Sequence, residues 1–256
     1  MAAGCAVLTS LYRLPMQSAH ETKFHDLPEL RNRAQVFRDR AHAGDVLAGM
    51  LSGFHGSGAL VLGIPAGGVP VAATVAAALG LELDVAVVSK VLLPWTTEAG
   101  YGAVAFDGST WIDRRAAARF GLTDTQVLEG TDRARAKVAR RVALLHGGRA
   151  LDVDGRTVIL VDDGIAAGST LRAAIAALRR RGVGCLVVAV PTGHGRSLSD
   201  LAPEVDALYC ANVRHGLSFA VADAYQAWRD VAEEEVALAL RAAQARTAAE
   251  GSRDGQ

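Results

Sequence analysis

The stretch TVILVDDGIAAGSTLRAAIAALRRRG, residues 157–182, decides the fold. Its first seven residues, 157–163, form the strongest strand pattern of the chain, because a continuous apolar run is typical of a strand buried on both faces. A Gly-rich turn follows, and residues 169–181 have the pattern of a helix that ends at Gly182. This order of strand, turn and helix indicates one unit of an α/β sheet.

The same alternation of strands and helices continues on both sides of this unit. Further strands are expected at 59–63, 85–89, 103–106, 110–112, 185–191 and 207–213. Helices are expected at 33–54, 69–79, 123–146 and 231–250, and a long loop at 90–102. Runs of Val, Leu, Ile and Ala in the strands predict a parallel, Rossmann-like sheet with helices on both faces. The predicted fold class is therefore α/β.

The length of 256 residues suits one large domain or two small ones. No clear linker or internal repeat divides the chain, so one α/β domain with terminal additions is the simplest organisation. We expect an irregular N-terminal extension over 1–30, a single domain over 31–245 and a frayed tail over 246–256.

Composition excludes several classes of protein. The 27 basic residues balance 27 acidic ones, whereas a surface that grips nucleic acid or anionic membrane should be clearly basic. No stretch approaches the roughly 20 apolar residues that span a bilayer, and the N-terminus lacks the features of a signal peptide. Three widely spaced cysteines indicate neither a disulfide framework nor a zinc site. We expect a cytoplasmic protein with no nucleic-acid or membrane partner, and a homodimer as the candidate assembly.

The chemistry is expected at the carboxyl ends of the strands, where open α/β sheets bind ligands. Asp162 and Asp163 end the strand at 157–163, and a turn of small residues leads into a helix. Backbone amides, hydroxyls and the helix N-terminus would together bind a phosphate group. The residues of this turn are Gly164, Ile165, Ala166, Ala167, Gly168, Ser169 and Thr170. Two carboxylates before a phosphate site favour a sugar phosphate, whose ribose hydroxyls would meet the carboxylates.

Three segments of the chain resemble type I phosphoribosyltransferases. Residues 158–170, VILVDDGIAAGST, resemble the motif of that family that binds phosphoribosyl pyrophosphate (PRPP). Residues 63–80 resemble its pyrophosphate loop, and residues 87–108 resemble the strand, lysine and mobile loop that close over the substrate. The resemblance extends over about 33–240, because segments 37–48 and 219–236 also fit a stand-alone phosphoribosyltransferase-like subgroup.

The resemblance implies both a fold and an activity. The fold would be the parallel type I core, with a small hood built from the N-terminal segment or from residues about 192–228. The activity would be transfer of the 5-phosphoribosyl group from PRPP to a nitrogen nucleophile, such as a nucleobase, with release of pyrophosphate. Mg²⁺ would enter with PRPP, with Asp162 and Asp163 as candidate ligands.

The same resemblance implies a role for each site residue. Asp162 and Asp163 would bind the ribose and act with Lys90 as the catalytic residues, and the turn 164–170 would bind the 5′-phosphate. The loop residues Ala66, Gly67 and Gly68 would bind pyrophosphate. Ala66 and Ala167 depart from the family pattern, in which a basic residue and a threonine are usual.

Two other functions fit the same residues. The first is a non-catalytic PRPP-binding or nucleotide-binding module that regulates a partner, and the two departures favour it slightly. The second is another α/β nucleotide-handling enzyme in which the aspartate pair holds a metal.

Several further side chains are weaker candidates. His194 follows a strand and could line the site, and four aromatic residues could stack on an acceptor base: Trp95, Tyr101, Phe219 and Trp228. The Arg-rich face of the helix at 123–146 is expected to be a solvated surface.

Overall fold

A computed structural model describes residues 24–96, 99–147, 149–216 and 218–251 of the chain, the last five by backbone alone. Six strands form one sheet in the order β1-β9-β8-β7-β2-β3, and every pair in it is parallel. Its strands are β1 (Phe24–Asp26), β2 (Leu60–Gly63), β3 (Glu82–Val85), β7 (Thr157–Val161), β8 (Cys185–His194) and β9 (Ala207–Arg214). The predicted parallel α/β core is confirmed.

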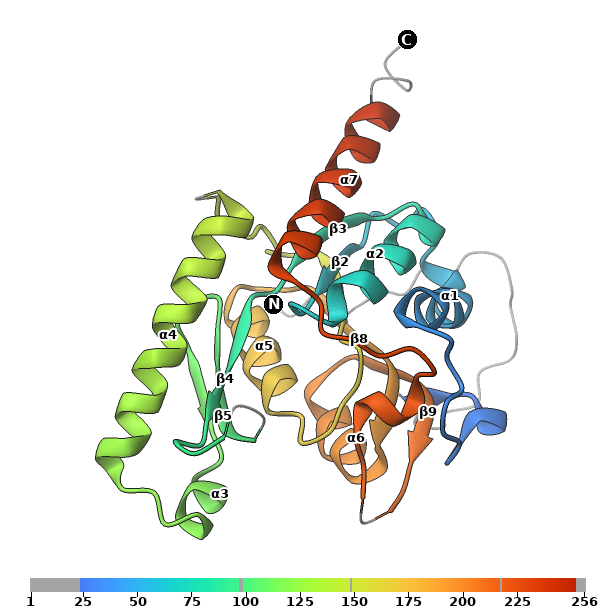
Figure 1. Ribbon diagram of the computed structural model, residues 1–256. Coiled ribbons are helices and arrows are strands. Elements are labelled where there is room, and N and C mark those ends of the chain that lie inside the picture. The colour runs from blue at the N-terminus through green and yellow to red at the C-terminus, as the bar shows by residue number, and fades with distance from the viewer. Residues whose placement is uncertain (1–23, 97–98, 148, 217, 252–256) are drawn as a thin grey trace.

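Helices cover both faces of this sheet (Figure 1). One face bears α1 (Arg40–Met50), α2 (Gly68–Leu79) and α7 (Glu233–Gly251), and the other bears α5 (Ser169–Arg180) and α6 (Gly195–Leu201). Neighbouring residues of β7 alternate between the two cores, with Ile159 and Val161 in the first and Val158 and Leu160 in the second. This alternation follows from the two-residue period of a strand, and it explains why the strand is apolar throughout.

A second, antiparallel sheet lies beside the core. It consists of β4 (Val88–Leu92), β5 (Gly100–Ala105) and β6 (Thr110–Ile112). The long helix α4 (Asp124–His146) packs against β4 and β5, and the short helix α3 (Arg114–Arg119) precedes it. A capping box between Thr123 and Gln126 begins α4.

The second sheet corrects two predictions. The strand expected at 85–89 is divided, because β3 ends at Val85 in the first sheet and β4 begins at Val88 in the second. The loop expected at 90–102 is wrong at both ends, since Lys90–Leu92 pair with Gly100–Ala103 as a hairpin. Pro, Gly and Thr suggested a loop, but the pairing of the two arms satisfies their backbone groups and leaves only about 93–99 as the connection.

The first helix is shorter than predicted. The expected helix at 33–54 begins only at Arg40, where the Asp39 side chain accepts a hydrogen bond from the His42 amide. Gln35 has a positive φ, and Phe37 pairs with Tyr225 instead of continuing a helix. A short 3-10 turn, Ser52–Phe54, replaces the last predicted residues.

The two ends of the chain also differ from expectation. Strand β1 and a 3-10 turn at Pro28–Leu30 lie within the segment 1–30 that was expected to be irregular, and β1 pairs with β9. Helix α7 continues to Gly251, within the tail expected to fray. Residues 1–23 and 252–256, on which the rest of these predictions fall, lie outside the described part of the chain.

Further 3-10 turns are Ala202–Glu204 and Val221–Ala224. Among the described helices, none is long and apolar enough to cross a membrane.

Candidate active site

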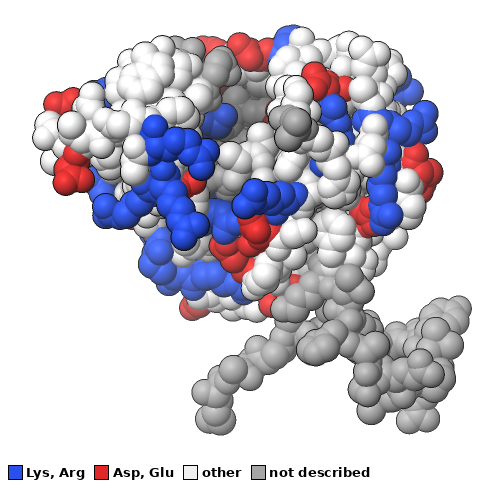
Figure 2. Space-filling view, turned by 90° about the horizontal axis from the view of Figure 1, so that it is seen from below, with Lys and Arg blue, Asp and Glu red and all other residues white. Residues whose placement is uncertain are grey.

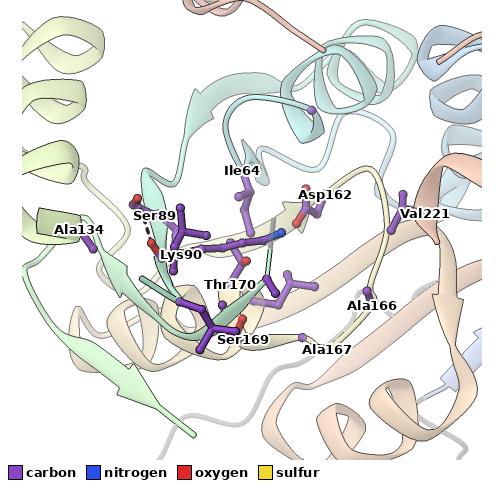
Figure 3. A pocket seen from close by; sticks show the side chains of 18 of the residues that line it. Ile64, Ser89, Lys90, Ala134, Asp162, Ala166, Ala167, Ser169, Thr170 and Val221 are labelled. Atoms are coloured by element: carbon purple, nitrogen blue, oxygen red, sulfur yellow. Dashed lines mark hydrogen bonds between the residues drawn. The ribbon is translucent and has the colours of Figure 1, made fainter. Parts of the chain in front are cut away.

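A cleft of about 1230 Å³ opens at the carboxyl ends of β2 and β7. Gly63 and Val161 are register partners in these two strands, so the loops that follow them start side by side. The cleft is closed on its other side by β4 and α4 (Figure 3). The position agrees with the expectation that ligands bind beyond the carboxyl ends of parallel strands.

Two glycines allow the loop after β2 to contact the aspartate pair. A Cβ atom on Gly67 would lie 1.9 Å from Oδ2 of Asp163, and one on Gly68 would lie 2.7 Å from the Val161 carbonyl oxygen. Both distances are too short for a side chain, so the close packing of the two loops requires glycine. Of this loop Gly67 lines the cleft, whereas Ala66 packs against the core and the Gly68 amide donates to the Ile64 carbonyl.

The aspartate pair is held in an environment that disfavours two negative charges. Burial raises the pKa of Asp162 well above its usual range, and the charge of Asp163 raises it further. Burial also raises the pKa of Asp163, although the positive charges of Arg40 and Lys90 oppose the shift. The amide of Asp163 donates to Oδ1 of Asp162, 2.9 Å away. Such raised carboxyl pKa values are typical of functional sites.

Arg40 is a site residue that the sequence interpretation missed. Its Nε and Nη2 atoms lie 3.0 and 2.9 Å from Oδ2 of Asp163, and Nη1 donates to the Arg229 carbonyl at 2.8 Å. Its guanidinium lies 4.0 Å from the ring centroid of Trp228. Tyr225 completes the support, because its hydroxyl donates to the backbone carbonyl of Asp163 at 2.7 Å. One signal was present: Arg40 is followed by buried residues at helical spacing, so a charge lies on an apolar face.

The turn after Asp163 lines the cleft and has unpaired amides. Within the described chain, none of the amides of residues 166–170 donates to another group. Gly168 has a φ of +79°, and α5 begins after it with no side-chain cap. The five amides and the helix N-terminus therefore remain available for an anion. Ile165 differs, because its amide donates to the Thr192 carbonyl and its side chain is buried.

Lys90 extends from β4 into the cleft. Figure 3 shows its side chain reaching across the pocket toward Asp162. The strand places it there, because Lys90 is exposed while its neighbour Val91 is buried against α4. The structure thus brings together Lys90, both aspartates, Gly67 and the turn 164–170 in one cleft.

The weaker candidates differ in whether they line the cleft. Trp228 lines the cleft, and residues 220–222 line it too, within the segment expected to form a hood. Tyr101 is buried and its hydroxyl donates to the Gln126 carbonyl, so it supports α4. The remaining three candidates do not line the cleft: Trp95, His194 and Phe219.

The Arg-rich face of α4 is solvated, as predicted, since Arg133, Lys137 and Arg140 are exposed. In addition, three of its cations, Arg133, Lys137 and Arg141, line the cleft. Sequence spacing alone predicted one face of the helix but not what that face meets. Among the described residues, no group of three or more His, Cys, Asp or Glu could hold a metal by itself.

Comparison with known proteins identifies the family. The model of the phosphoribosyl transferase domain matches residues 40–206, which include both loops and the aspartate pair. The chain belongs to the phosphoribosyl transferase family.

Two relatives and one solved structure are similar to this chain over most of its length. Proteins of two Mycobacterium tuberculosis strains, provisionally named phosphoribosyl transferases, are 34% identical over 208 residues, which make up 80% of this chain. The match covers 46% of each of these relatives, so the chain spans about half their length. The crystal structure of TT1426 from Thermus thermophilus is 34% identical, covers 80% of this chain and 97% of its own, and has a TM-score of 0.64.

Proposed function

We propose that this chain transfers the 5-phosphoribosyl group of PRPP to a nitrogen nucleophile and releases pyrophosphate. One observation carries the proposal: a carboxylate pair lies between a turn with five unpaired amides and a lysine, all within one cleft. A sugar with a phosphate at one end and a diphosphate at the other matches this order of groups.

In this proposal the phosphate turn holds the donor by its 5′-phosphate. The amides of residues 166–170 and the hydroxyls of Ser169 and Thr170 would donate to the phosphate oxygens, and the dipole of α5 would favour the negative charge. The methyl group of Ala167 replaces a usual hydroxyl, which removes one donor but leaves the amides in place. Ile165 anchors the turn through Thr192 instead of binding the ligand.

The aspartate pair would act on the ribose. The hydroxyls of the ribose would donate to the carboxylates of Asp162 and Asp163. These hydrogen bonds would orient the anomeric carbon of the sugar toward Lys90 and Gly67. As the bond from that carbon to the diphosphate breaks, the leaving group takes the electron pair and the sugar becomes positively charged. The two carboxylates stabilise this charge, while Lys90 and the Gly67 amide meet the negative charge of the leaving group.

Mg²⁺ fits the donor set of the cleft. Magnesium prefers one or two carboxylates together with substrate phosphates and water, and Asp162 and Asp163 are adjacent carboxylates that line the cleft. When bound, the ion would neutralise charge that develops on the leaving diphosphate. Asp163 is already held by Arg40, so Asp162 is the carboxylate more available to the ion.

Calorimetry with Mg·PRPP tests the proposal first, and an assay for pyrophosphate release with a panel of nucleobases tests it second. Binding followed by release supports a transferase. Binding with no release for any base would favour the regulatory module instead, and a lack of binding would contradict both.

Asp163→Asn is the variant that tests the ribose assignment. We expect pyrophosphate release to fall about 100-fold or more, because an oriented charge that acts on the transition state is worth that much. Asp200→Asn is the matched control, since Asp200 is an exposed aspartate of α6 outside the cleft. Equal rates for wild type and Asp163→Asn would remove the aspartate from the mechanism.

A further inference from the structure

Helix α4 presents a single face to the cleft. Seven of its residues line the cavity in two rows with a spacing of four residues: Gln126, Gly130 and Ala134 in one, and Glu129, Arg133, Lys137 and Arg141 in the other. Three are cations placed successively four residues apart, and one is an acid. Residues at this spacing lie above one another on a helix, so the cations form a row along the wall of the cleft.

Close packing fixes the position of α4 relative to β4 and β5. A Cβ atom on Gly130 would lie 2.4 Å from the hydroxyl of Tyr101 and 3.2 Å from Cγ1 of Val91. The Tyr101 hydroxyl also donates to the Gln126 carbonyl at 3.4 Å. The backbone of α4 therefore lies directly against β4 and β5, and β4 is the strand that carries Lys90. Val91 faces α4, so the side chain of its neighbour Lys90 leaves the opposite face of β4, and the α4 cations and Lys90 line the cleft from the two faces of this strand.

Two of the three cations have little compensation within the protein. Arg141 pairs with Glu233 of α7 at 2.6 Å. Arg133 lies 4.0 Å from Glu129, and both side chains are more than 60% exposed. Lys137 has no ion pair among the described residues, and partial burial, followed by the charge of Arg141, lowers the pKa of its ammonium group.

Like charges one turn apart destabilise a helix, so an anion between Arg133 and Lys137 would relieve a real cost. The diphosphate of the donor is the group that needs them. None of the residues 64–68 is basic, and Lys90 supplies a single charge at that end of the cleft. The 5′-phosphate, by contrast, already has the five amides of the turn. Arg133 and Lys137 line the same cleft as Lys90 and Asp162, so they are available to the diphosphate end of the donor.

We infer that Arg133 and Lys137 form a second cationic wall of the cleft, which binds the diphosphate of the donor and supplies the charge that loop 64–68 lacks. This inference rests on the proposed function, because it assigns more residues to the same donor.

Calorimetry with three ligands tests the wall. Mg·PRPP and Mg·pyrophosphate contain the diphosphate, whereas ribose 5-phosphate contains only the groups assigned to the aspartates and the phosphate turn. We expect Arg133→Gln and Lys137→Gln to weaken the first two about 10- to 100-fold, as the loss of a charged hydrogen bond does, and to leave ribose 5-phosphate unchanged.

Arg140→Gln is the matched control, because it removes the same charge from an exposed position of α4 that does not line the cleft. It should bind all three ligands as the wild type does. Thermal melting of each variant checks that the fold is retained.

Two results would overturn the assignment of Arg133 and Lys137 to the diphosphate. One is an unchanged affinity of both variants for Mg·pyrophosphate and Mg·PRPP, and the other is an equal loss of affinity for ribose 5-phosphate. These differ from failure of the proposed function, in which the wild type itself would bind neither PRPP nor ribose 5-phosphate. Because pyrophosphate is tested alone, the wall is supported or rejected even if the chain transfers nothing.

Discussion

Arg40 and Asp163 form the most tightly bound pair of the site. Both side chains are largely buried, with 10% and 15% of their surfaces exposed, and Arg40 directs two nitrogens at one carboxylate oxygen. The backbone carbonyl of Arg229 and the ring of Trp228 hold the guanidinium from other sides. A carboxylate placed this firmly does not need to be reoriented when a sugar binds, which is the condition for effective charge stabilisation.

Arg40→Gln should therefore destabilise the protein by about 3–5 kcal/mol at neutral pH, because it leaves the buried carboxylate unpaired. The loss should be smaller near pH 4, where Asp163, whose pKa burial already raises, takes up a proton instead. Chemical denaturation at both pH values measures this difference. Arg40→Lys is the control that keeps the charge and should recover part of the stability. A loss that is the same at both pH values would show that Arg40 acts through packing alone.

The buried carboxylate of Asp162 lowers the free energy of unfolding at neutral pH. The pKa of its carboxyl is higher in the folded protein than in the unfolded chain, so this group favours folding less as pH rises through the folded pKa. Asp162→Asn should raise the free energy of unfolding by about 0.5–2 kcal/mol at pH 7–8. The gain should disappear below about pH 4, where aspartate is protonated in both states. Denaturation curves across pH 3–8 test the prediction, and a variant less stable than wild type at pH 8 would contradict it.

At the scale of the elements, register brings the two ligand loops together. Gly63 and Val161 pair across neighbouring parallel strands, so the loops after β2 and β7 leave the sheet at the same level. Motif reading identified these loops one at a time, and it placed them at the correct ends of their strands. It did not identify β4 and β5 as a hairpin, because their pairing depends on two arms that meet in space and not on either arm's own pattern.

Gly67→Ala should disrupt this loop contact. The new methyl group would lie 1.9 Å from Oδ2 of Asp163, so the loop or the carboxylate must move. Overpacking of this kind costs about 1–3 kcal/mol of stability, and we expect weaker binding of Mg·PRPP by calorimetry. Gly53→Ala is the control, because a Cβ atom there meets nothing within 4 Å. If Gly67→Ala binds Mg·PRPP as Gly53→Ala does, the contact between the two loops is not needed for the site.

At the scale of the whole molecule, a net charge of zero coexists with local clusters of cations. Figure 2 shows Lys and Arg side chains gathered in groups on one face, with acidic side chains between them. The cleft has its own positive groups in Lys90, Arg133 and Lys137, and unpaired amides at the turn 166–170. A polyanionic ligand can be bound by such a local field without a basic surface, because salt screens interactions beyond about 8–10 Å.

Ligand binding should stabilise the entire fold, because the cleft joins the parallel core to the β4–β6 sheet and α4. Mg·PRPP at 100 times its Kd should add about 2.7 kcal/mol to the free energy of unfolding. Thermal melting with increasing Mg·PRPP measures the effect as a rise in Tm that depends on concentration. Free ribose, which lacks both phosphates, is the control and should leave Tm unchanged. A Tm that does not respond to Mg·PRPP would contradict binding in the cleft.

The sequence by itself determined the parallel core, the phosphate-binding turn and the aspartate pair. These features are local: an apolar run, a small-residue turn and a helix start lie within about 25 consecutive residues, so their pattern is legible in one stretch. Only the tertiary structure decided that Arg40 holds Asp163, across 123 positions of chain, and that α4 turns its cations into the cleft. Those contacts join distant segments, and periodicity reports which face of a helix is polar but not what that face will meet.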